Sequence, residues 1–226
     1  MRIILSALCF LMVAAVGAAE KADSPATNEV AAGDSFTLPN AWTGSVIGAT
    51  NGNPYLVDNK PRWRIDRLWP DTPLAGVDYI VMTWSGTNWV AKDNSYEGQP
   101  SVVVLDGVAT LSARSAAERA PGGKIPVLIF IAPDAGTYRA EGSTLAKISP
   151  VGSAVTLTIF KLQTKTKVKH VSRVEMMAVG NNKQQDLKKL KIKMEAGDEL
   201  AFVPQFSGLG VKADITLNNL KIIRTP

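Results

Sequence analysis

The stretch from Pro126 to Ala146, PVLIFIAPDAGTYRAEGSTLA, most constrains what this chain can fold into. An apolar run at 127–131 meets the turn residues of 133–136, and a second short run follows at 137–140. Runs of this length bounded by Pro, Asp and Gly are typical of β-strands and turns. The stretch therefore predicts two strands joined by a turn.

The same pattern recurs along the chain. Asp106-Gly107, between the apolar runs 101–105 and 108–112, is the strongest hairpin signal. A second hairpin is expected from 78–84 and 89–92, joined by the turn 85–88. Further strands are expected at 153–162, 164–174, 188–194, 199–203 and 211–223. Regular short strands without long helices predict an all-β fold, an antiparallel β-sandwich of the jelly-roll or Greek-key type.

The amino end has the pattern of an export signal. Arg2 precedes the apolar segment 3–16, and the small residues 17–19 form a cleavage site. The apolar segment is short for a membrane span, which needs about 20 residues. We therefore expect a signal peptide at 1–19, a flexible leader at 20–35, and one β-sandwich domain at 36–226. Its core is expected at about 78–226, after an aromatic-rich N-terminal elaboration.

The only cysteine of the chain, Cys9, lies within the expected signal peptide. Cleavage leaves a mature chain without thiols, which excludes disulfides, thiolate metal sites and a cysteine nucleophile. A cysteine-free exported protein fits a secreted or periplasmic location in a bacterium. No second apolar segment is long enough to span a membrane.

Aromatic residues concentrate in the first half, where all five tryptophans lie. Sugar rings stack on Trp and Tyr while their hydroxyls bond to polar neighbours. Trp84 and Trp89 flank the polar turn 85–88, so with Tyr96 they are the candidate glycan-contact residues. The alternative is that these tryptophans pack in the core, where most tryptophan surface is found.

Charge is polarised along the chain. Residues 20–160 carry 11 basic and 14 acidic residues, whereas residues 161–226 carry 13 basic and 6 acidic. Alternation with other residues predicts a row of lysines on one face of each of two strands. Such a face would attract a polyanion, or it would only solvate a sheet and guard its edge. The candidate polyanion-binding residues are Lys165, Lys167, Lys169, Lys189, Lys191 and Lys193.

The order of features from Phe130 to Ile222 resembles the jelly-roll modules that accompany secreted bacterial polysaccharide-active enzymes. The resemblance rests on the turn segment 130–139, the segment 196–203 and the closing strand 212–222, and it covers under half of the chain. It implies a sandwich fold and, by association, carbohydrate binding.

Such modules often hold a structural calcium on acidic residues, for which Glu141 and Asp214 are the candidates here. Residues 150–153, PVGS, stand where these modules often carry Asp-Gly, so the sequence does not support the ion. No other cofactor is expected.

Catalytic motifs are absent from the sequence. The single histidine, His170, excludes multi-histidine metal sites, and no serine has a nucleophile motif around it. Nor does any glycine-rich segment precede a helix as a phosphate-binding loop would. The chain is therefore not expected to be an enzyme.

Three hypotheses remain. The first is a secreted, non-catalytic module that binds polysaccharide or another extracellular polymer. The second is a structural or protein-interaction domain of an envelope or extracellular assembly, and the third is a carbohydrate-active enzyme. Sequence-specific recognition of nucleic acid is not expected, because the lysine-rich half has few aromatic residues for base stacking.

Overall fold

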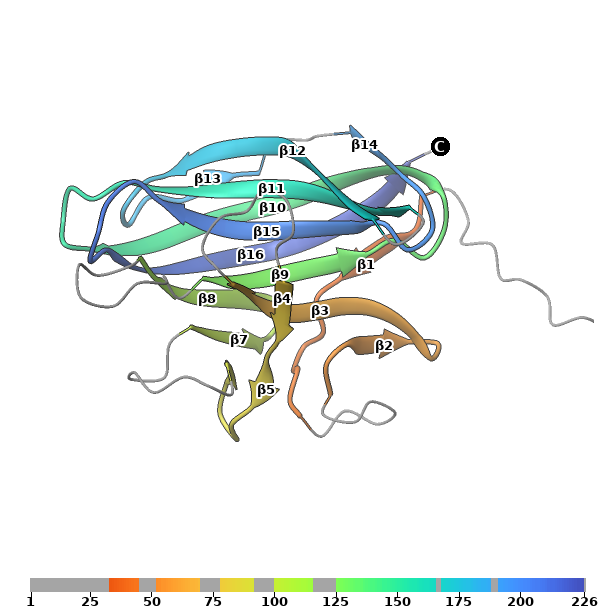
Figure 1. The fold of residues 1–226 in the computed structure, drawn as a ribbon, viewed down its shortest axis with the longest axis horizontal. Helices are drawn as coiled ribbons and strands as arrows, with labels where there is room; N and C mark the ends of the chain where they lie inside the picture. The colour runs from red at the N-terminus through yellow and green to blue at the C-terminus, as the bar shows by residue number, and fades with distance from the viewer. Residues whose placement is uncertain are drawn as a thin grey trace, which may run out of the picture.

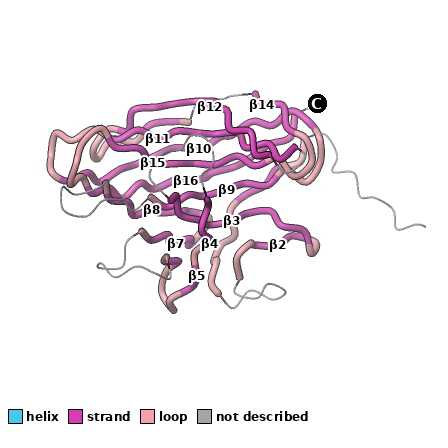
Figure 2. Tube along the Cα trace, in the orientation of Figure 1, coloured by secondary structure: helices cyan, strands magenta, loops and turns pink. Residues whose placement is uncertain are grey.

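The computed structural model describes residues 33–44, 52–69, 78–91, 100–115, 125–165, 168–187 and 191–225. Within these ranges the chain forms two antiparallel β-sheets that pack into a sandwich, which confirms the expected fold class (Figures 1 and 2). No helix in the described part is long and apolar enough to cross a membrane. The expected signal peptide, and the leader up to residue 32, lie outside the described residues.

The first sheet, sheet A, has nine described strands in the order β13-β10-β16-β8-β7-β6-β5, with β1 beside β16 and β14 beside β10. Its centre is the long antiparallel pair β10 and β16, which runs along the length of the molecule in Figure 1. The strands are β1 (Ser35–Thr37), β5 (Thr83–Trp84), β6 (Trp89–Val90), β7 (Ser101–Leu105), β8 (Val108–Arg114), β10 (Gly136–Ser149), β13 (Gln185–Asp186), β14 (Lys191–Met194) and β16 (Lys212–Thr225).

The second sheet, sheet B, has seven described strands in the order β12-β11-β15-β9-β3-β2, with β4 beside β3. Its strands are β2 (Tyr55–Val57), β3 (Lys60–Trp69), β4 (Asp78–Val81), β9 (Pro126–Ile131), β11 (Val155–Lys165), β12 (Val168–Val179) and β15 (Glu199–Phe206).

Alternating side chains of both sheets fill the main core, and a second, smaller buried cluster is formed by the other side chains of β9, β11 and β15. In β8, Ala109, Leu111 and Ala113 are buried, while the residues between them are partly exposed, as a half-buried strand requires. Trp63 and Trp89 belong to the same buried cluster as the late strands of the chain. The described part of the tryptophan-rich half therefore packs into the core that the rest of the chain forms.

The two strands expected from the stretch at 126–146 are present as β9 and β10, but they do not pair with each other. β9 pairs with β15 and β3 in sheet B, whereas β10 pairs with β16 in sheet A. The turn at 133–135 thus carries the chain from one sheet to the other. The Tyr138 hydroxyl fixes this turn by donating a hydrogen bond to the Asp134 carbonyl at 2.8 Å.

The single strand expected at 78–84 is also divided between the sheets. β4 pairs with β3 in sheet B, and β5 forms the expected hairpin with β6 in sheet A. Between them, the Met82 backbone bonds to β3 and its side chain is fully buried. The expected hairpin of β7 and β8 is confirmed, with Asp106 and Gly107 at positive φ.

Candidate binding surfaces

The three candidate glycan-contact residues differ in their placement. Trp89 has no exposed area, and its Nε1–H donates a hydrogen bond to the Trp42 carbonyl at 2.9 Å. Trp84 is partly exposed and lies against Trp89, with ring centroids 5.5 Å apart. Tyr96 lies outside the described residues. The structure therefore places Trp89 in the core rather than on a contact surface.

The polar side chains of the turn between Trp84 and Trp89 hydrogen-bond to one another. The Ser85 hydroxyl donates to Asn88 Oδ1 at 2.6 Å, and the Thr87 hydroxyl donates to the same oxygen at 3.1 Å. Side chains of these types stabilise tight turns in this way. The polar neighbours that made Trp84 a candidate are thus explained by the geometry of the turn.

The prediction of a lysine row on one strand at 165–169 is wrong, because Lys165 ends β11 and Lys169 lies on β12, whereas the described part of the row predicted at 189–193 lies on one strand of the other sheet. Lys165 and Lys169 lie on the paired strands β11 and β12 of sheet B, where only their backbone is described. Lys191 and Lys193 are exposed on β14 in sheet A, where Lys191 stands opposite Arg139 of β10. Lys167 and Lys189 lie outside the described residues. His170 pairs through its backbone with Gln163.

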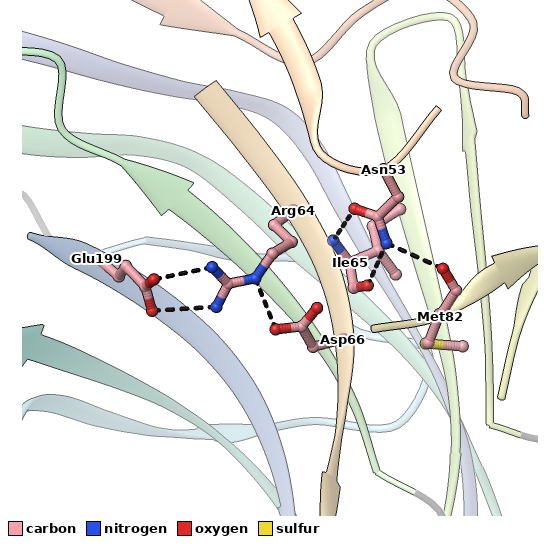
Figure 3. Close-up of polar contacts among 6 residues, drawn as sticks. All are labelled: Asn53, Arg64, Ile65, Asp66, Met82 and Glu199. Atoms are coloured by element: carbon pink, nitrogen blue, oxygen red, sulfur yellow. Dashed lines mark hydrogen bonds and ion pairs between the residues drawn. The ribbon is translucent and has the colours of Figure 1, made fainter. Parts of the chain in front are cut away.

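A partly buried ion-pair network joins β3 to β15 in sheet B (Figure 3). Arg64 donates two hydrogen bonds to Glu199, at 2.8 and 3.2 Å, and its Nε donates to Asp66 at 2.7 Å. Burial alone would lower the pKa of Arg64, but the two carboxylates outweigh it, so the pKa is raised. Both carboxylate oxygens of Glu199 accept a hydrogen bond from the Arg64 guanidinium, which is the strong, bidentate form of this ion pair. The network therefore links β3 to β15 through ion pairs.

On the opposite side of β3 from the Arg64 network, the side chain of Asn53 joins its own segment to β3 and to the segment at Met82 (Figure 3). Its Oδ1 accepts from the Ile65 N–H at 3.0 Å, and its Nδ2 donates to the carbonyls of Ile65 and Met82 at 2.6 and 3.0 Å. All of these groups are buried, so each needs a partner inside the protein. Asn53 is therefore a structural residue.

The described residues also form an open cleft at one end of sheet A. Its volume is about 540 Å³, within the range of small-ligand sites. Strand pairing sets its floor, because Lys147 of β10 stands opposite Asp214 of β16 and Ser149 stands opposite Lys212. The lining residues are Lys147, Ile148, Ser149, Val151, Asn181, Asn182, Lys212, Ala213 and Asp214.

The wall of the cleft is tied to the sheet by hydrogen bonds. Asn181 Oδ1 accepts from the Ile148 N–H at 2.9 Å, and the Asn182 N–H donates to the Ala146 carbonyl at 2.7 Å. Asn182 has a φ of 52°, a conformation that asparagine tolerates better than most residues. The exposed side chain of Asn182 is thus held beside the lysines by a fixed backbone.

The cleft opens onto the outer face of sheet A, which is polar next to the cleft. Strand register places Ser112 beside Asp214, and Arg114 beside Lys212. One row further along, Thr110 and Thr216 stand opposite each other, with their hydroxyl oxygens 3.4 Å apart. Ammonium, carboxylate, amide and hydroxyl groups therefore share one surface, and this arrangement can hydrogen-bond a ligand rich in hydroxyls.

The sequence analysis missed this cleft, except for Asp214, which it named as a calcium candidate. The alternation of polar and apolar residues at 212–217 indicates an outward face but not the strand that lies beside it. Glu141, the other calcium candidate, forms an ion pair with Arg139 at 2.6 Å. It stands opposite Lys221, whereas Asp214 stands opposite Lys147, six residues along β10, which corresponds to about 20 Å. The structure does not bring Glu141 and Asp214 together.

No protein-family model and no curated protein matches the chain. Solved structures resemble it weakly. The CBM22-1 xylan-binding domain of Paenibacillus barcinonensis Xyn10C is 13% identical with a TM-score of 0.40, over 86% of this chain and 97% of that one.

The CBM22-1 and GH10 modules of Clostridium thermocellum endo-1,4-beta-D-xylanase 10B, complexed with xylohexaose, are 11% identical with a TM-score of 0.34. The match covers 52% of this chain and 25% of that one. Isomalto-dextranase of Arthrobacter globiformis T6, complexed with panose, is 15% identical with a TM-score of 0.31, over 71% of this chain and 23% of that one. Likenesses of this size carry no argument about ligand, so the function has to be argued from the residues of this chain.

Proposed function

We propose that this chain is an exported, non-catalytic module that binds polysaccharide on the outer face of sheet A. The observation that carries the proposal is the cleft at 147–149, 181–182 and 212–214, which continues into a row of hydroxyl side chains. A polysaccharide is long and carries hydroxyl groups along its whole length. It therefore needs an open surface with many hydrogen-bonding groups rather than an enclosed pocket.

The groups in the cleft suit such a ligand. The amide of Asn182 and the carboxylate of Asp214 offer acceptors for sugar hydroxyls, and Lys147 offers donors. Lys147, Asn182 and Asp214 are all exposed, so a polymer can reach them without any rearrangement of the core. Hydrogen bonds of this kind give orientation, and the summed contacts along a polymer give affinity.

The non-catalytic part of the proposal has its own support. Four described carboxylates form ion pairs with basic side chains: Asp66 and Glu199 with Arg64, Glu141 with Arg139, and Asp198 with Lys161. Glycoside hydrolysis needs two carboxylates flanking one bond, of which one must carry a proton. The expected signal peptide supports export.

The test is retention of the protein, purified from residue 20 onward, on immobilised neutral and acidic polysaccharides. Soluble products are analysed in the same samples. We expect retention without product formation. Product formation would replace the proposal with an enzyme, and absence of retention on every polysaccharide would refute it.

Matched variants locate the site. Asn182 and Asn59 are both exposed asparagines at positive φ in turns, so Asn182→Gly and Asn59→Gly remove equivalent side chains without backbone strain. We expect Asn182→Gly to weaken retention and Asn59→Gly to leave it unchanged. Equal retention by the two variants would show that the cleft does not contact the polymer.

A protein-interaction role is the second candidate, and it is favoured by the outer side chains of β7. Val103 and Leu105 are 38% and 57% exposed on β7, where Val103 stands opposite Thr110 of β8. Exposed apolar side chains placed together are typical of contact surfaces between proteins. Failure of all polysaccharides in the retention test would leave this role as the one to examine.

A further inference from the structure

The outer face of sheet A carries an excess of positive charge that is divided between its two ends. The cleft end has Arg114, Lys147 and Lys212. The opposite end has Arg139 on β10 and Lys221 on β16, together with Lys191 and Lys193 on the neighbouring β14. The acidic residues on the described part of this face are Glu141, Asp186 and Asp214.

The two cationic ends lie far apart along the same strands. Arg139 and Lys147 are separated by eight residues of β10, which corresponds to roughly 26 Å at the rise of a β-strand. Between them the face presents the uncharged polar side chains of Thr216 and Asn218 on β16 and Thr110 on β8, together with the apolar Leu145 on β10 and the acidic Asp186 on β13. A polymer that lies along β10 and β16 therefore meets cations at both ends and hydrogen-bonding groups in the middle.

Resting on the proposed function, we infer that the ligand of this face is an anionic polysaccharide, such as a polyuronate, that lies lengthwise along β10 and β16. The cleft binds one part of the polymer through Lys147 and Lys212. The cluster of Arg139, Lys191, Lys193 and Lys221 binds a part about 26 Å away. Cations that are spaced in this way along one polymer act as linked weak sites, so affinity grows with polymer length.

The composition of the face favours a polysaccharide over a nucleic acid. Its described side chains include no aromatic ring on which a base could stack. Most of its cations are lysines, which lack the bidentate fork that arginine offers to phosphate. The hydroxyl and amide groups between the cationic ends match the hydroxyls of sugar rings.

The experiment measures affinity for soluble polygalacturonate, with neutral xylan and single-stranded DNA as comparison ligands, at low and high salt. Three lysines in exposed strand positions are changed singly: Lys147→Gln at the cleft end, Lys191→Gln at the opposite end, and Lys60→Gln in sheet B as the control. We expect each of the first two to weaken polygalacturonate binding about two- to fivefold, the range for an exposed charge pair. The control keeps wild-type affinity, and salt weakens binding throughout.

Four results would overturn the inference. Salt-independent binding of xylan without binding of polygalacturonate would remove the anionic ligand but leave the proposed function standing, whereas absence of binding to both would remove both. Wild-type affinity of Lys191→Gln together with weakened Lys147→Gln would contradict the lengthwise placement. DNA binding as tight as polygalacturonate binding would contradict the ligand class.

Polymer length gives an independent readout. At equal concentrations of uronate units, we expect the polymer to compete far better than digalacturonate, because the dimer is too short to reach both cationic ends. Equal competition by the dimer would show that a single end suffices, which would refute the lengthwise placement.

Discussion

Replacing Trp89 by alanine removes a side chain from the centre of the aromatic packing, and we expect a large loss of stability. Its ring lies 5.8 Å from that of Trp42 and 5.5 Å from that of Trp84, and none of its surface is exposed. Truncating a buried tryptophan to alanine costs about 3–5 kcal/mol. The change also removes the Nε1–H that bonds the Trp42 carbonyl, so we place the loss in the upper part of that range.

Urea unfolding followed by circular dichroism measures this loss. With a slope near 2 kcal/mol per molar of urea, the midpoint should fall by about 2 M. Trp84→Ala is the matched control, because Trp84 packs against the same ring but is partly exposed, and its midpoint should fall by less than half as much. A midpoint for Trp89→Ala within about 0.3 M of wild type, combined with lost glycan retention, would refute its assignment to the core.

Three further changes test separate parts of the structure. Asn53→Ala removes the side chain that bonds the buried Ile65 N–H and Met82 carbonyl, whereas the Ile65 carbonyl keeps its bond from the Met82 N–H. The free energy of unfolding should therefore fall by about 2 kcal/mol in urea titration, and an unchanged value would contradict the bonding seen around Asn53. Gly142→Ala should cost roughly 1–3 kcal/mol by the same measurement, because Gly142 has a φ of 134° and an added Cβ would lie 2.8 Å from the Asn218 carbonyl oxygen. Gly142 lies where the register of β10 against β16 shifts, between Glu141 and Ser143, and wild-type stability would show that this shift does not require glycine. Burial raises the pKa of Tyr138 in the folded protein, so as pH rises the unfolded chain loses the phenol proton first. The stability that this difference contributes is fully present below about pH 10 and is lost as pH rises through the raised pKa. Tyr138→Phe should remove that part of the pH dependence, and equal pH profiles of the two proteins would contradict it.

The local parts of the fold could be predicted from the sequence. Asp106-Gly107 identified the hairpin of β7 and β8, because both residues adopt the positive φ that a tight two-residue turn requires. The turn at 85–88 identified the hairpin of β5 and β6 for a similar reason. In both cases the residues that determine the pairing are neighbours in the chain.

Pairing between distant strands could not be predicted in the same way. The segment 133–135 has the composition of a hairpin turn, yet it connects the two sheets, because β9 pairs with residues of β15 and β3 rather than with β10. The run at 78–84 could not be divided from its sequence either. Nothing in its composition marks Met82 as the point where the chain leaves sheet B and enters sheet A. Composition indicates a strand and a turn, whereas the partner depends on packing across the whole core.

The candidate site depended on long-range register in the same way. Lys147 and Asp214 meet only because β10 and β16 pair over most of their length. The lysine alternation at 189–193 did indicate exposure of Lys191 and Lys193, but it could not show that β14 lies beside β10 while β11 and β12 lie in the other sheet. Burial of Trp89 was the alternative that the sequence left open.

The most direct test of the account compares retention on polysaccharide by a cleft variant and by an aromatic variant that both fold. We predict that Lys147→Gln combined with Asn182→Gly lowers retention while Trp84→Ala keeps it at the wild-type level. The reverse result, with retention lost in Trp84→Ala and kept in the cleft variant, would contradict the placement of the binding surface at the cleft formed by β10 and β16.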